Sequence, residues 1–424
     1  MADNTISTEY TSAGIPVITD PVPGCRISGY MVAVNTGSRD ETQEIMGLSH
    51  LLEHVVFRAT DTRTSFQMSK EIEGAGGEMN AFTAKEMTAF YGITLKETSK
   101  VAKDLVADIV RNPLIDKEDT ELEKKIVLQE ISMCENDPDS YIHDLFGEVL
   151  WDGHRLGQNE AGTREVVKSL TFKDLRKYYE DRYRIPNLTV FACGAVDAQD
   201  AVAWAEENFD DMAGGKANVR KAPEVTGSVY KHYKWEGDHC YVGMGFRAFD
   251  AKSDEIPALS MLSAVLGSGS SSRLFQDVRE KKALVYSIYD YVDQYTDAGS
   301  MGTFMSATEE NVYEAVSTVA RTYKSLKENG LTEGELTRVK NLVKGALIRS
   351  TESTDRRLYS LAKGTMLTGK PRSLDERLAR LDAVTEEDVM RIAEKVMKPE
   401  GLNVVMYGAD VKEMKDFSTS QLDF

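Results

Sequence analysis

Long apolar runs and targeting signals are both missing from this chain of 424 residues. No run approaches the ~18 apolar residues that a membrane-spanning helix needs. The amino terminus has no basic segment followed by an apolar one, and it is neither rich in arginine nor poor in acidic residues. We therefore expect a cytoplasmic protein that does not associate with a membrane.

Cysteine and positive charge are also scarce. The four cysteines, Cys25, Cys134, Cys193 and Cys240, form no CxxC pair, which is typical of reduced and mostly buried thiols. The net charge is −18, and this argues against nucleic acid as a partner because phosphate binding needs a basic face. The acidic excess fits either a basic partner or a solvated surface, and the solvated surface is the simpler interpretation.

The chain has the composition of a folded protein, with 41% hydrophobic and 28% charged residues. It is too long for one compact core, so we expect two or more domains. Segments rich in β-branched and aromatic residues alternate with segments of helical amphipathic pattern. The predicted strands include 26–35, 87–95 and 187–194, and the predicted helices include 97–112, 116–136 and 171–184.

An internal repeat relates the two halves of the chain. Residues 170–194 align without a gap to residues 384–408, at an offset of 214 positions. Two further pairs keep the same offset: Glu121-Leu122 with Glu335-Leu336, and Leu48-Ser49 with Leu262-Ser263. A constant register across three separated segments indicates duplication.

The repeat predicts an α+β fold of two related domains, each a mainly antiparallel sheet packed with helices. The segment 213–228 is small, polar and contains Gly and Pro, so it is the expected linker. We therefore expect an N-terminal domain over 1–212 and a C-terminal domain over 229–424.

Histidine is rare, yet two of the six histidines lie one helical turn apart in "GLSHLLEHVVF", residues 47–57. At this spacing His50 and His54 share one helix face and can chelate one metal ion, for which zinc is suitable. Glu53 projects near the same face, close enough to contact a metal-bound water without competing for the metal. The alternative is a surface helix that carries two histidines by chance.

The second half of the chain has no equivalent of these three side chains. At the offset of 214 the corresponding residues are Ala264, Gly267 and Ser268. A structural role for the histidines would more readily have been kept in both copies. We therefore expect the chemistry in the first half only.

A catalytic zinc needs three protein ligands and one open position, so a third ligand must come from elsewhere. The predicted helix 116–136 offers Glu123 and Glu130, two turns apart among apolar residues. Carboxylates on a half-buried face are costly unless they are paired or bind a metal. The repeat places Thr337 and Lys344 at these positions, so the second half lacks both carboxylates. Ordinary surface glutamates are the alternative.

Four sequence blocks together carry a family resemblance. They are "TGSRDETQEIMGLSHLLEHVVF" (36–57), "GGEMNAFTAKEMTAFY" (76–91), "EKKIVLQEISMCENDPDS" (123–140) and "SSSRLFQDVREKKALVYSI" (270–288). The chain resembles the pitrilysin-type zinc metallopeptidases, the inverzincin family with the HxxEH signature. This family includes insulin-degrading enzyme and the mitochondrial processing peptidase.

The resemblance implies a role for each matched residue. His50, His54 and Glu130 would be the ligands of one zinc ion per chain, and Glu53 the general base that activates the zinc-bound water. Glu123 would be a carboxylate beside the ligands.

The resemblance extends to the second half, where Arg279 and Tyr286 would reach the substrate carbonyl and the transition state. The chain departs from the family at Ala283, where glycine is usual, and at Ser49, where alanine is more common. Neither departure changes a proposed catalytic group.

The strand-like segment 78–84 is a candidate for substrate binding. A substrate peptide could pair with its edge through residues Asn80, Ala81, Phe82 and Thr83, because backbone pairing tolerates many sequences. The alternative is an ordinary strand that is fully paired within the protein.

The implied function is a zinc endopeptidase that hydrolyses unfolded peptides. In the family, two domains form a half-shell and two half-shells enclose a chamber. The length of this chain matches one half-shell, so the resemblance implies pairing, with itself or with a partner subunit. Because the zinc ligands and the Arg279–Tyr286 pair are both present, a homodimer with two complete sites is the simpler expectation. The alternatives are the catalytic subunit of a heterodimeric processing peptidase and a non-catalytic assembly subunit of a larger complex.

Overall fold

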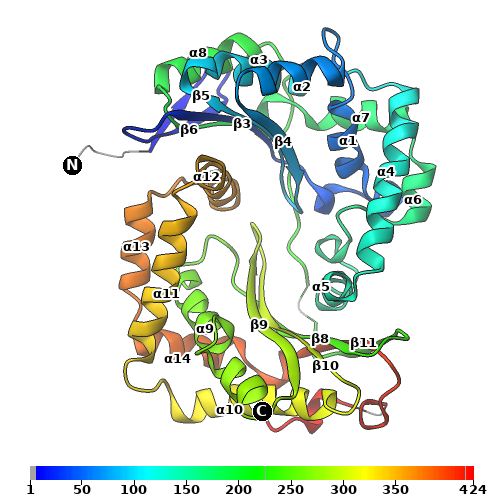
Figure 1. Cartoon of the computed structure of the whole chain (residues 1–424), viewed down its shortest axis with the longest axis vertical. Helices are drawn as coiled ribbons and strands as arrows, with labels where there is room; N and C mark the ends of the chain where they lie inside the picture. Colours follow the sequence, from blue (N-terminus) through cyan, green and yellow to red (C-terminus); the bar gives the residue numbers. More distant parts are fainter. Residues whose placement is uncertain (1–5, 225, 416) are drawn as a thin grey trace. The chain divides into compact units, whose positions relative to one another are not determined.

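The computed structural model describes residues 6–224, 226–415 and 417–424, which form two β-sheets covered by helices (Figure 1). The first sheet has six strands in the order β1-β2-β6-β3-β5-β4. Its strands are β1 (Ser7–Tyr10), β2 (Pro16–Pro21), β6 (Leu188–Gly194), β3 (Ile27–Val34), β5 (Thr88–Leu95) and β4 (Glu78–Thr83). All neighbours are antiparallel except β2 and β6.

The second sheet has five strands in the order β7-β11-β8-β10-β9. Its strands are β7 (Tyr230–Lys234), β11 (Asn403–Gly408), β8 (Cys240–Ala248), β10 (Gly299–Ala307) and β9 (Val285–Gln294). Only β7 and β11 run parallel. The predicted α+β class, with two mainly antiparallel sheets packed by helices, is confirmed.

The local predictions agree with the elements of the structure. Each of the three predicted strands matches β3, β5 or β6 with ends that differ by at most one residue. The predicted helices match α3 (Ser99–Arg111), α4 (Lys117–Glu135) and α7 (Phe172–Arg182) within two residues at each end. The period of the hydrophobic residues and the content of β-branched residues are therefore sufficient to predict these helices and strands.

The chain divides into two compact units. The first unit comprises 1–132, 158–220 and 348–374, and the second comprises 133–157, 221–347 and 375–424. The helices wholly or mostly in the first unit are α1 (Leu48–Val56), α2 (Ser65–Gly74), α3, α4, α6 (Arg164–Ser169), α7, α8 (Ala198–Phe209) and α12 (Thr354–Thr368). Those of the second are α5 (Pro138–Leu150), α9 (Ile256–Gly267), α10 (Val312–Asn329), α11 (Glu335–Ser350), α13 (Leu374–Asp382) and α14 (Glu386–Val396).

The two units exchange one helix each. Helix α5 comes from the first half of the sequence but contacts β8 and β11, while α12 comes from the second half and contacts β3 and β6. At the offset of 214, α5 falls on residues that are mostly α12. The compact units thus differ from the predicted segments 1–212 and 229–424 by two equivalent helices, because distant apolar contacts decide which sheet a helix covers.

The hydrophobic core of the first unit fixes the orientation of helix α1, which carries His50 and His54. Helix α1 buries Leu48, Leu51, Leu52 and Val55, which follow the i, i+3, i+4, i+7 spacing of one helix face. They pack with buried strand and helix residues that include Val32 of β3. The opposite face of α1 therefore points away from the core.

Among the described residues, none of the helices combines the length and the apolar composition that a bilayer crossing needs.

Candidate metal centre

Two histidine side chains project from the polar face of α1. The ring centroids of His50 and His54 lie 4.7 Å apart with the planes nearly perpendicular. Both side chains are about one-fifth exposed, so they are partly shielded from water but can be reached. This is the geometry that the one-turn spacing predicts.

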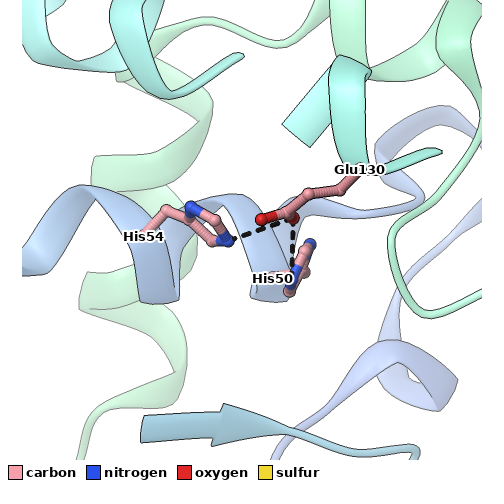
Figure 2. A group of neighbouring side chains, drawn as sticks. All are labelled: His50, His54 and Glu130. Atoms are coloured by element: carbon pink, nitrogen blue, oxygen red, sulfur yellow. Dashed lines mark ion pairs between the residues drawn. The ribbon is translucent and has the colours of Figure 1, made fainter. Parts of the chain in front are cut away.

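Glu130 of helix α4 extends its carboxylate toward the two imidazoles (Figure 2). Glu130 Oε2 lies 3.7 Å from His50 Nε2 and 3.4 Å from His54 Nε2. One ligand atom from each residue lies within 4.8 Å of the others. The packing of α4 in the first unit thus brings together two helices that are about 75 residues apart in sequence.

The donor set fits zinc. Two imidazole nitrogens and one carboxylate oxygen are a common set of three protein ligands, with a fourth position left for water or substrate. Burial, and secondarily the neighbouring His54, lowers the pKa of His50 to about 4. His50 is therefore neutral near pH 7, which is the form of imidazole that binds a metal.

Glu123 orients one of the two imidazoles. Its Oε2 lies 3.0 Å from His54 Nδ1. Because a carboxylate oxygen accepts, the Nδ1–H group donates a hydrogen bond to Glu123, and Nε2 is left to coordinate a metal. Glu123 is only 5% exposed and its other oxygen lies 3.7 Å from Arg58 Nε. Arg58 also pairs with Asp119 at 3.1 Å. The buried Glu123 carboxylate is therefore paired on both oxygens.

Glu53 receives a hydrogen bond from the first sheet. The Thr83 hydroxyl, at the end of β4, donates to Glu53 Oε2 at 2.7 Å. Burial raises the pKa of Glu53, and the bond from Thr83 lowers it in part. The sequence predicts only a substrate-binding role for Thr83, because nothing in the local pattern indicates which helix β4 lies against.

The other residues of the predicted substrate strand lie on β4, at one edge of the first sheet. Asn80 is exposed, and its side chain accepts a hydrogen bond from the backbone N–H of Ala81 at 2.8 Å. The ring of Phe82 packs against Tyr359 of α12, with centroids 4.9 Å apart. Within the described residues β4 pairs with β5 alone, so its other edge has no strand beside it.

Arg279 and Tyr286 lie in the second compact unit, whereas the His–His–Glu group lies in the first. Arg279 belongs to a short helical turn, Phe275–Glu280, and its guanidinium lies 4.7 Å from the centre of the Phe275 ring. Tyr286 is on β9 and is 78% exposed. Neither residue is part of the cluster in Figure 2.

Comparison with protein families gives two matches in tandem. Residues 17–164 match a family described as insulinase, peptidase family M16, and residues 169–343 match a family described as the peptidase M16 inactive domain. An uncharacterized zinc protease of Streptomyces coelicolor is 33% identical over 91% of this chain and 85% of its own length. An uncharacterized zinc protease of Bacillus subtilis is 34% identical over 90% of this chain and 93% of its own.

Solved structures share the fold. A peptidase M16 inactive domain structure from Pseudomonas fluorescens superposes with a TM-score of 0.89 at 18% identity, covering 96% of this chain and 98% of that one. A protease from Helicobacter pylori superposes with a TM-score of 0.88 at 20% identity, covering 95% and 99%. At these identities the likeness establishes the architecture.

Proposed function

Because the chain belongs to the insulinase family of peptidases, peptidase family M16, we propose that it is a zinc endopeptidase that hydrolyses unfolded peptides. The observation that carries the proposal is the grouping of His50, His54 and Glu130, with Glu53 on the same helix. The relatives described as zinc proteases support the metal and the reaction class.

His50, His54 and Glu130 would hold one zinc ion. When bound, zinc supplies Lewis-acid chemistry, since it polarises a carbonyl and lowers the pKa of water toward neutrality. Glu123 keeps the His54 ring in the orientation that directs Nε2 into the group. The partly exposed Glu130 carboxylate leaves one side of the group open to a substrate.

Glu53 acts as the general base. It accepts a proton from the attacking water and passes it to the leaving nitrogen, a role that contributes about 10²–10⁴-fold in enzymes. The hydrogen bond from Thr83 holds the carboxylate in place. We further assign Arg279 and Tyr286 to the stabilisation of negative charge on the carbonyl oxygen, on the basis of the sequence block that contains them.

The substrate would bind as an additional strand on β4. Residues Asn80, Ala81, Phe82 and Thr83 lie at the edge of the first sheet, where backbone groups can pair with an extended peptide. Thr83 joins this edge to Glu53. Strand addition needs an extended segment, which favours unfolded peptides. We propose that the active form is a homodimer, because one chain carries both the His–His–Glu group and the block with Arg279 and Tyr286.

The test compares the wild-type chain with Glu53→Gln. We expect the wild type to bind one zinc ion and to cleave an unfolded peptide. Glu53→Gln should keep the zinc but lose activity by at least 100-fold, because the amide cannot accept the proton. Metal analysis and peptide mass spectrometry measure both properties.

Glu130→Gln is the matched control, since it should lose zinc and activity together. Equal cleavage by the wild type and Glu53→Gln would contradict the proposal. A wild-type chain that binds zinc without cleaving any peptide would favour an assembly role.

A further inference from the structure

The helix that carries both histidines begins without a capping side chain of its own. The residue at its N-cap is Gly47, which adopts φ 86° and has no side chain to accept a hydrogen bond. The first N–H groups of any helix lack partners within the helix and need acceptors from outside. The start of α1 therefore depends on groups elsewhere in the chain.

Glu41 supplies these acceptors. Its Oε2 accepts a hydrogen bond from Gly47 N at 2.7 Å, and its Oε1 accepts one from Ser49 N at 2.5 Å. Glu41 is 1% exposed, so both bonds are shielded from water. One buried side chain thus holds the backbone on both sides of Leu48, directly before His50.

Further contacts fix the same turn. The Ser49 hydroxyl lies 2.8 Å from the Tyr178 hydroxyl of α7, which lies 2.8 Å from the Thr36 hydroxyl. A Cβ atom on Gly47 would lie 2.3 Å from the carbonyl oxygen of Ala161, so the backbone is tightly packed there. Ser49 thus links the first turn of α1 to α7.

The second half of the chain provides an internal comparison. At the offset of 214, Glu41 corresponds to Glu255, which is the N-cap residue of α9. Helix α9 begins at Ile256, so the N–H groups that correspond to those of Gly47 and Ser49 lie inside a helix. Glu255 instead pairs with Arg391 and Lys395 of α14, at 2.5 and 3.0 Å.

The same residue type therefore has two different roles in the two copies. Of the two corresponding helices, α1 is shorter than α9 and has the buried Glu41 carboxylate at its start, whereas the Glu255 side chain is 24% exposed. We propose that Glu41 is a positioning residue of the metal centre, which fixes the first turn of α1 so that His50 meets His54 and Glu130. The inference rests on the proposed function, because it assumes that this group holds zinc.

The experiment measures zinc affinity, by competition with a chelator, for the wild type, Glu41→Gln and Glu255→Gln. The Gln side chain has the same size as Glu, but its NH₂ group replaces one of the two acceptor oxygens. An NH₂ group cannot accept a hydrogen bond from the backbone N–H that it faces. We expect Glu41→Gln to bind zinc about 10–100-fold more weakly, as for other residues that orient ligands. Glu255→Gln should keep the wild-type affinity.

Hydrogen exchange and melting of the zinc-free proteins separate positioning from general stability. In Glu41→Gln, the backbone N–H groups of residues 47–49 should exchange faster than in the wild type. The melting temperature of the variant should stay well above the temperature at which zinc affinity is measured. Wild-type zinc affinity in folded Glu41→Gln would overturn the inference and leave the proposed function intact.

Two further outcomes are decisive. If Glu41→Gln does not fold, Glu41→Asp replaces it. The Asp side chain is too short to reach both N–H groups, so the zinc affinity of Glu41→Asp should also fall. A wild-type zinc affinity in this variant would overturn the inference. Absence of zinc binding by the wild type would overturn both the inference and the proposed function.

Discussion

At the residue scale, the hydrogen bond from Thr83 to Glu53 links the proposed substrate-binding edge of β4 to the proposed general base. We expect Thr83→Val to lower kcat about tenfold, since a hydrogen bond to a charged group contributes roughly 1.5–3 kcal/mol. Thr83→Ser should restore the activity because it keeps the hydroxyl. Steady-state kinetics with an unfolded peptide, together with metal analysis, measure this effect. An unchanged kcat, or a loss of zinc, would contradict the positioning role of the hydroxyl.

A second residue-scale prediction concerns Asp290, a partly buried residue of β9 whose Oδ2 atom is shielded from water. It accepts a hydrogen bond from Thr303 at 2.8 Å, and burial raises its pKa to about 8. The folded state therefore binds the proton more tightly than the unfolded state, where the pKa is about 4. The contribution of Asp290 to the free energy of unfolding should therefore be fully present below about pH 4, and it should be lost as the pH rises to about 8.

Asp290→Asn removes the titrating group and keeps an oxygen that can accept from Thr303. We expect the decline in melting temperature between pH 5 and pH 8 to be smaller in Asp290→Asn than in the wild type. Thermal melts across this range measure the difference. Parallel curves for the two proteins would show that Asp290 does not titrate in this window.

At the element scale, the turn between the helical segment Phe275–Glu280 and strand β9 contains a strained residue. Ala283 has φ 50°, in the left-handed region that costs a residue with a Cβ roughly 1–2 kcal/mol. The resemblance of residues 270–288 to the family block predicts glycine at this position, and glycine adopts this region without strain.

Ala283→Gly should relieve this strain. We expect the free energy of unfolding to increase by up to about 1 kcal/mol, because the greater freedom of glycine in the unfolded chain offsets part of the gain. Urea denaturation measures it. A decrease in stability would show that the entropy cost of glycine exceeds the strain at this turn.

At the scale of the whole molecule, the exchange of α5 and α12 makes each sheet depend on the other half of the sequence. Helix α12 buries Leu358 and Ala362 in a cluster with Met31 and Phe191 of the first sheet. Arg357 of α12 pairs with Asp20 of β2 at 2.6 Å, and the Asp20 side chain is 4% exposed. Without α12, an apolar face and a buried carboxylate would lose their partners.

We therefore expect the fragment 1–212 to fail to fold cooperatively when expressed alone. Exposed apolar surface should make it bind a hydrophobic dye and aggregate, whereas co-expression with 213–424 should restore a soluble complex. Dye binding and denaturant titration measure both states. A sharp, cooperative unfolding transition of the isolated fragment would contradict this dependence.

Much of the fold and part of the site followed from local patterns. The pairing of His50 with His54 depends only on helix periodicity, and β-branched runs identified β3, β5 and β6. For the third residue of the group, the sequence pattern left both Glu123 and Glu130 open. The contact of α4 with α1 places Glu130 against both imidazoles and Glu123 behind one of them.

The sequence by itself determined what is local or periodic: the amphipathic helices, the offset of 214 positions and the lack of equivalents of His50 and His54 in the second half. Only the tertiary structure decided which distant groups meet. The carboxylate of Glu130, the hydroxyl of Thr83 and the cap from Glu41 all reach α1 from other segments. Backbone geometry fixes the neighbours within a helix, whereas contacts between elements depend on how their apolar faces pack.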